Sequence, residues 1–86
     1  MKILHLVKSP GDVLAYETAD NQRRSGLDEV WILLLHDAVY TPPPSWDKLY
    51  ISRDDILARG VNTPGIQVDH GEIVDLLFAA DTVVNW

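Results

Sequence analysis

Two short apolar runs, Ile3–Val7 and Glu29–Leu35, constrain the fold of this chain most strongly. A strand with one face in water alternates apolar and polar residues, whereas a strand buried on both faces is apolar almost throughout. Both runs have strand length and do not alternate, so they predict central strands of a parallel sheet. Three shorter runs, rich in Ile, Val and aromatic residues, predict further strands at Lys48–Ser52, Ile66–Val68 and Thr82–Trp86.

Helices are predicted between these strands, roughly over residues 10–24, 53–59 and 70–80. Ser9, Ser52 and Asp69 are the expected caps, because each is a capping residue type with an acidic residue three positions later. Gly26 and Gly60 stand where a left-handed residue would close the first and second helices. The segment 36–40 has room for at most one helical turn.

Strands that alternate with helices predict an α/β fold, a three-layer α/β/α sandwich with a mostly parallel sheet of about five strands. Residues 1–86 are expected to form a single domain. Three short helices are few for two faces of such a sheet, so we expect apolar surface that another subunit covers. The proline-rich segment Thr41–Ser45 is expected to be an extended surface connection.

The formal charge of −6 argues against nucleic-acid binding, because phosphate contacts need clustered Lys and Arg. No apolar run approaches the ~20 residues that span a bilayer, so no membrane association is expected. The chain has no cysteine, which fits a reducing, cytoplasmic location. Because a thiolate is the side-chain group that carries sulfur, the chain alone cannot hold a persulfide.

Candidate site residues lie after the predicted strands, where open parallel sheets bind their ligands. His36, Asp37, Asp69 and His70 could meet at this edge as a small metal-dependent active site, although neither pair has a metal-ligand spacing. Ser9 and Ser52 are better explained as helix caps than as nucleophiles, and no phosphate-binding glycine pattern follows the first strand. The sequence therefore predicts no catalytic group, metal or cofactor for the chain on its own.

Five segments, in order along the chain, resemble the DsrH/TusB family. They are Ile3–Pro10 (I-L-H-L-V-K-S-P), Leu34–Tyr40 (L-L-H-D-A-V-Y), Leu49–Ile51 with Asp55–Gly60 (D-I-L-A-R-G), Ile73–Leu76 (I-V-D-L) and the terminal Trp86. The resemblance implies a DsrEFH-like fold and a role as a subunit of a sulfur-relay complex, beside DsrE/TusD-like and DsrF/TusC-like subunits. Such complexes act in 2-thiolation of the tRNA wobble uridine or in sulfur oxidation.

The chain departs from the family pattern at three places. Some members carry a cysteine on the first helix, near Ala19 (or Thr18) of this chain, and neither residue is cysteine. Thr41–Ser45 stands where family members usually have a longer helix, and Ala38 replaces the glycine of the second motif. We therefore expect a non-catalytic, partner-positioning subunit. A small His/Asp-site enzyme and a free-standing homo-oligomer are the alternatives.

The partner interface is expected around the carboxyl end of the second strand and the loop that follows it. Asp37, Tyr40 and Arg59 fall on the family-like motifs, and Trp and Tyr are frequent interface anchors. The predicted interface residues are His36, Asp37, Val39, Tyr40, Trp46 and Arg59. Tyr40 and Trp46 flank the proline-rich segment, and folding back onto their own domain is the alternative for each.

Overall fold

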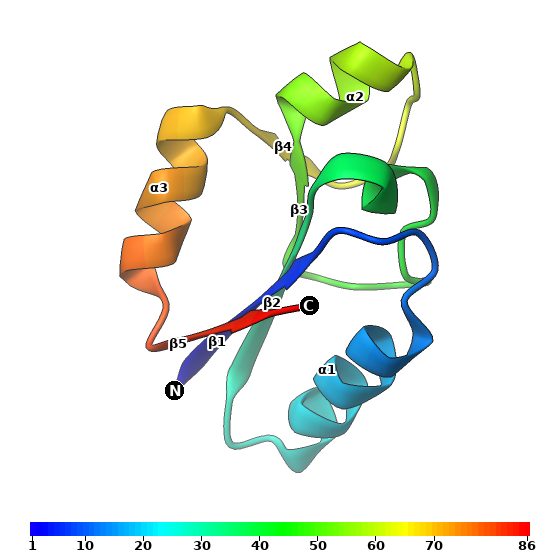
Figure 1. The fold of residues 1–86 in the computed structure, drawn as a ribbon. Helices are drawn as coiled ribbons and strands as arrows, with labels where there is room; N and C mark the ends of the chain where they lie inside the picture. The colour runs from blue at the N-terminus through cyan, green and yellow to red at the C-terminus, as the bar shows by residue number, and fades with distance from the viewer.

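The computed structural model describes residues 1–86 and confirms the α/β fold (Figure 1). Along the chain the elements are β1 (Lys2–Val7), α1 (Val13–Ser25), β2 (Glu29–Leu34), a 3₁₀ helix η1 (His36–Tyr40), β3 (Leu49–Ser52), α2 (Arg53–Arg59), β4 (Ile66–Val68), α3 (His70–Ala79) and β5 (Thr82–Asn85). All strands are parallel, in the order β4-β3-β2-β1-β5. None of the helices is both long and apolar enough to span a membrane.

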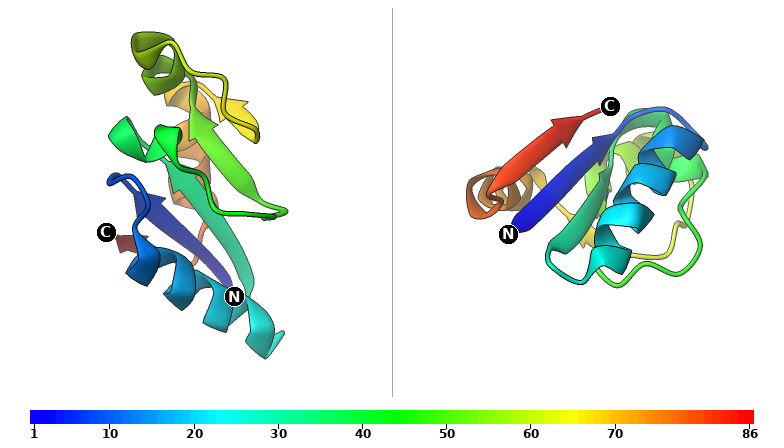
Figure 2. Two further views of the ribbon diagram at one scale, coloured as in Figure 1. Left: turned by 90° about the vertical axis from the view of Figure 1, so that its right-hand side faces the viewer. Right: turned by 90° about the horizontal axis from the view of Figure 1, so that it is seen from below.

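The strand order determines which face of the sheet each helix covers. The chain steps from β1 through β2 and β3 to β4 in one direction, and α3 then carries it back to β5 at the opposite edge. Because parallel crossovers are right-handed, this reversal places α3 on the face opposite α1. Figure 2 shows the two helices on opposite sides of the strands.

The two faces of the sheet are buried to different extents. On the α1 face, 11 residues form a buried cluster that includes Ala15, Ala19, Ile32 and Ile51. On the α3 face the buried cluster has only 4 residues: Leu4, Trp31, Leu33 and Val68. No residue of α3 is itself buried. The α3 face is therefore the less complete half of the core.

Most of the expected helix ends are confirmed. The Ser52 hydroxyl accepts a hydrogen bond from the Asp55 N–H, and Asp69 forms a capping box with Glu72. Gly26 and Gly60 adopt the left-handed conformation after α1 and α2. These matches follow from local hydrogen bonding, which the sequence encodes directly.

The expected cap at Ser9 is wrong. Helix α1 begins at Val13, and the cap is Asp12, whose Oδ1 accepts a hydrogen bond from the Ala15 N–H at 3.1 Å. Gly11 has a φ of 61°, which a right-handed helix does not allow, so a helix cannot begin at Pro10. The Ser9–Gly11 segment is a turn that precedes the cap.

The last residue of the chain is fixed against the first strand. The Trp86 Nε1–H donates to His5 Nδ1 at 2.9 Å, and the two rings stack with their centroids 6.0 Å apart. His5 is completely buried, and its Nε2 lies 2.6 Å from Gln22 Oε1 on α1. Lys8 and Asn85, next to the carboxyl ends of β1 and β5, are hydrogen-bonded as well. Side chains of the chain itself therefore join β1 and β5 at the point where the sheet reverses its order, which is where ligands bind in open α/β sheets.

Candidate partner-binding site at the carboxyl edge of the sheet

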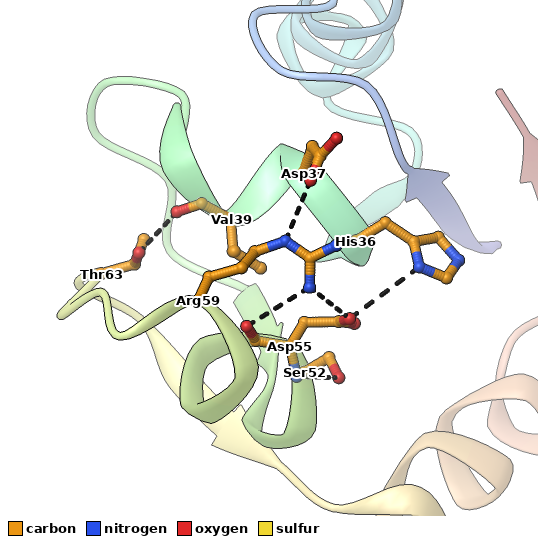
Figure 3. A network of polar contacts seen from close by, with 7 residues as sticks. All are labelled: His36, Asp37, Val39, Ser52, Asp55, Arg59 and Thr63. Carbon is orange, nitrogen blue, oxygen red and sulfur yellow. Dashed lines mark hydrogen bonds and ion pairs between the residues drawn. The ribbon is translucent and has the colours of Figure 1, made fainter.

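Four charged or titratable side chains from two elements meet at the carboxyl edge of the sheet (Figure 3). Arg59 Nε donates to Asp37 Oδ1 at 2.9 Å, and Arg59 Nη1 donates to Asp55 Oδ1 at 3.0 Å. His36 Nδ1 lies 3.8 Å from the same Asp55 oxygen. Because β2 and β3 are paired parallel strands, η1 and α2, which follow them closely, are brought side by side.

The backbone of η1 is held firmly under this network. His36 has a left-handed φ of 51°, which turns the chain out of β2. Ala38 and Val39 are completely buried beneath the network, and the Val39 carbonyl accepts a hydrogen bond from the Thr63 hydroxyl at 2.5 Å. Asp37 and Tyr40 are therefore presented from a short element that is anchored in the core.

Hydrogen bonds, together with the neighbouring charges, shift the pKa values of the inner groups toward their charged forms. Burial alone would raise the pKa of Asp55, but hydrogen bonds from the His36 backbone and the Ser52 side chain, with the charges of His36 and Arg59, lower it below its usual value. The hydrogen bond to Asp37 raises the pKa of Arg59, and the charges of both aspartates act in the same direction. Asp55 and Arg59 are thus charged across the physiological pH range.

The structure brings four of the six predicted interface residues together. His36, Asp37 and Tyr40 are exposed, and the Arg59 side chain is 22% exposed. Val39 is completely buried, so it supports the site from below.

Trp46 is the residue that does not join this group. Its Nε1–H donates to the Val30 carbonyl at 3.1 Å, and the Arg23 guanidinium lies 4.3 Å from its ring centroid. Val30 is near the start of β2, about six residues before His36, which at ~3.3 Å per residue corresponds to roughly 20 Å. Trp46 therefore folds back onto α1 and the amino end of β2.

Two residues of the site were missed by sequence reasoning. Asp55 is four residues before Arg59 on α2, a spacing at which side chains of opposite charge pair on one helix face. From the sequence alone, Asp55 is expected as a capping acid and as a motif residue, but not as an interface residue. Thr63 lies in an irregular segment before β4, and no local pattern indicates that its hydroxyl reaches η1.

The residues proposed for an alternative metal site do not assemble. The structure holds no group of three or more His, Cys, Asp or Glu side chains that could bind a metal ion. Asp69 accepts the Glu72 N–H as the cap of α3, while Asp37 is paired with Arg59. Ser52 is buried as the cap of α2, so its hydroxyl already has a structural role.

Comparison with known proteins adds no assignment. No protein-family model matches the sequence, and no curated protein matches it. A function for the chain has to come from its own residues and their arrangement.

Proposed function

We propose that this chain is a cytoplasmic, non-catalytic subunit of a sulfur-relay complex of the DsrH/TusB type. One observation carries the proposal: the charged residues of two family-like motifs meet in one network. Asp37 belongs to the Leu34–Tyr40 segment, while Asp55 and Arg59 belong to the Asp55–Gly60 segment, and Arg59 pairs with both aspartates. Residues that are 22 positions apart in the chain thus form one surface feature.

The arrangement suits a binding surface. The Arg59 guanidinium uses Nε and Nη1 within the chain, so its remaining nitrogen is available to a carboxylate of a partner subunit. Tyr40, on the same short helix as Asp37, is 53% exposed, and tyrosine offers a rigid apolar ring with a hydrogen-bonding tip. A buried backbone below and fixed ion pairs above reduce the conformational entropy that these side chains lose on binding.

The first helix supports a role without sulfur chemistry. Ala19, near the position where some family members carry a cysteine, is completely buried against the sheet. With no cysteine anywhere in the chain, a persulfide would have to be carried by a partner. The chain would then position that partner rather than accept sulfur from it.

Reconstitution tests the proposed complex. The purified chain is mixed with the DsrE/TusD-like and DsrF/TusC-like subunits of the same organism and analysed by size-exclusion chromatography with light scattering. We expect a joint complex, and we expect Tyr40→Ala to weaken it about tenfold or more, as the loss of an interface anchor of ~1.4 kcal/mol or more would.

Leu27→Ala is the matched control, because Leu27 is 82% exposed and lies at the opposite, amino edge of the sheet. It should leave the complex intact. The proposal would be contradicted by a complex whose affinity is unchanged by Tyr40→Ala, or by subunits that do not associate at micromolar concentration. Light scattering of the chain alone separates a homo-oligomer from a subunit that needs other partners.

A further inference from the structure

Helix α3 carries an unbalanced charge. No Lys or Arg follows Arg59 in the sequence, whereas residues 60–86 contain four acidic residues: Asp69, Glu72, Asp75 and Asp81. The last turn of α3 has no basic residue to complement the helix dipole. The part of the chain that contains α3, the helix on this face of the sheet, is therefore acidic.

A groove of about 290 Å³ runs between α3 and the edge strand β4. Tyr50, Ile66, Val68 and Leu76 provide its apolar lining, and Glu72 and Asp75 belong to its rim. We call this the acidic groove. Its volume is near the lower limit of ~300 Å³ for small-molecule pockets, so it suits a single large side chain better than a cofactor.

Apolar surface is left uncovered around this groove. Ile66 is 48% exposed at the sheet edge, and Phe78, the only phenylalanine of the chain, is 87% exposed. Phe78 lies three residues after Asp75 on α3, a spacing that places the two side chains next to each other on the helix surface. Phe78 does not line the groove, but it extends the exposed apolar surface next to it, and such a patch rimmed by polar residues is typical of an interaction site.

The acidic side chains of the groove form no ion pair with a cation of the chain itself. Lys2 lies over the ring of Trp31 with Nζ 5.7 Å from the centroid, and Trp31 does not line the groove. Neither Glu72 nor Asp75 forms an ion pair, and the Glu72 side chain accepts only the Asp69 N–H. The rim is free to pair with cations from outside the chain.

We infer that the acidic groove is a docking surface for a basic amphipathic segment of another protein. The segment would place one large apolar side chain against Tyr50 and Ile66 while its Lys or Arg side chains pair with Glu72 and Asp75. Charge complementarity selects this occupant. A second copy presenting its own α3 would oppose acid to acid, and nucleic acid would be repelled.

This surface does not depend on the proposed sulfur-relay role. The acidic groove lies on the α3 face between α3 and β4, whereas the Asp37–Arg59 network belongs to η1 and α2. Tyr40→Ala is therefore expected to leave docking in the groove unchanged, so failure of either proposal can be recognised separately.

The probe is a fluorescein-labelled synthetic helix of about 14 residues, four turns, with Leu on one face and Lys elsewhere. One comparison peptide has Glu in place of Lys, and a second keeps Lys but has Ser in place of Leu. Anisotropy titrations at about 150 mM salt limit long-range attraction, because the Debye length is then about 8 Å. We expect the Leu/Lys peptide to bind at least tenfold more tightly than either comparison peptide.

Variants then locate the site. Glu72→Gln with Asp75→Asn should weaken binding about tenfold, and Gln at position 72 still accepts the Asp69 N–H, so the helix cap is kept. Ile66→Ser should weaken binding similarly, since this side chain lines the groove and is 48% exposed. The matched control, Glu17→Gln with Asp47→Asn, removes two exposed acids away from the groove.

The outcomes separate the possibilities. Weaker binding for the groove variants alone, with amide chemical-shift changes confined to α3 and β4, supports the inference. Equal weakening by the control pair indicates non-specific attraction to an acidic protein and overturns it. Equal binding of the Lys and Glu peptides, or shift changes confined to α1, overturns it as well.

Discussion

The hydrogen-bond partners of His5 determine which nitrogen of its ring carries the proton. The Trp86 indole can only donate, so His5 Nδ1 must accept, and the proton of a neutral ring then lies on Nε2, which donates to Gln22 Oε1. Protonation of His5 would turn Nδ1 into a donor and break the bond to Trp86. The groups that contact the ring, Gln22 and Trp86, carry no charge that could favour the imidazolium.

The stability of the fold should therefore fall in mild acid. Burial lowers the pKa of His5 below 6.5, and the weaker effect of the Gln22 hydrogen bond does not reverse this. As the pH falls, His5 takes up a proton in the unfolded chain before it does so in the folded one. The contribution of neutral His5 to stability is therefore fully present above about pH 6.5, and it is lost as the pH falls toward and through the folded-state pKa. We predict a lower urea midpoint at pH 5 than at pH 7.5.

The variant His5→Asn isolates this effect, since its amide oxygen can accept from Trp86 but does not titrate. His36 and His70 are exposed and remain in both proteins, so the difference between the two pH profiles reports on His5. If the variant keeps the full pH dependence, His5 is not the responsible group.

Among the elements, α3 depends most on its own ends. It buries no residue, so tertiary packing contributes less to it than to α1, and its capping box supplies hydrogen bonds that the helix otherwise lacks. We predict that Asp69→Ala lowers the free energy of unfolding by about 1 kcal/mol. Asp54→Ala is the control, because Asp54 is an exposed acid in the first turn of α2 that caps nothing. This change should alter the free energy of unfolding by less than about 0.5 kcal/mol. Urea unfolding measures both, and equal effects would contradict this dependence on the cap.

The turn before β4 requires glycine. Gly65 has a φ of 139°, and a Cβ there would lie 2.6 Å from Ile51 Cδ1 and 3.2 Å from the Leu49 carbonyl oxygen. We predict that Gly65→Ala destabilises the protein by about 2 kcal/mol, through backbone strain and the close contact together.

Gly71→Ala is the matched control for this turn. Gly71 lies in the first turn of α3 without a positive φ, and the nearest atom to an added Cβ is an Asp69 side-chain oxygen at 3.5 Å. Its replacement should be neutral or stabilising by up to about 1 kcal/mol. A Gly65→Ala protein as stable as the control variant would show that the turn relaxes freely.

The elements that the sequence predicts well are those whose signal is local. The runs Ile3–Val7 and Glu29–Leu35 predict buried strands because burial on both faces excludes polar alternation. The start of α1 was misplaced because Ser9 and Asp12 are both good caps, and only the backbone turn at Gly11 decides between them. The position of Trp46 depends on Val30 and Arg23, which are distant in sequence, so local patterns could not place it.

For the whole molecule, net charge decides what the isolated chain binds. With a formal charge of −6 and no cation after Arg59, it offers few contacts to phosphate. We predict no sub-micromolar binding of tRNA in a gel shift at about 150 mM salt. Tight binding with a steep dependence on salt concentration would contradict this.

Absence of cysteine gives a second prediction for the whole chain. After incubation with a cysteine desulfurase and labelled cysteine, the intact mass should be unchanged, because no thiolate is present to accept sulfur. A DsrE/TusD-like subunit in the same mixture serves as the positive control. A stable adduct of about 32 Da, one sulfur atom, on this chain would contradict the prediction.

The pairing of β1 with β5 also has a consequence for the order of assembly. Ile3 pairs with Val30 on one side and with Thr82 on the other, so the second pairing closes a chain segment about three times as long. That difference adds roughly 1 kcal/mol of loop-closure entropy. Since β5 is also a mostly exposed edge strand, it should join the sheet last and open first. Its amides should exchange with solvent sooner than those of β2, and the carboxyl-terminal residues should be the first to become accessible to proteases.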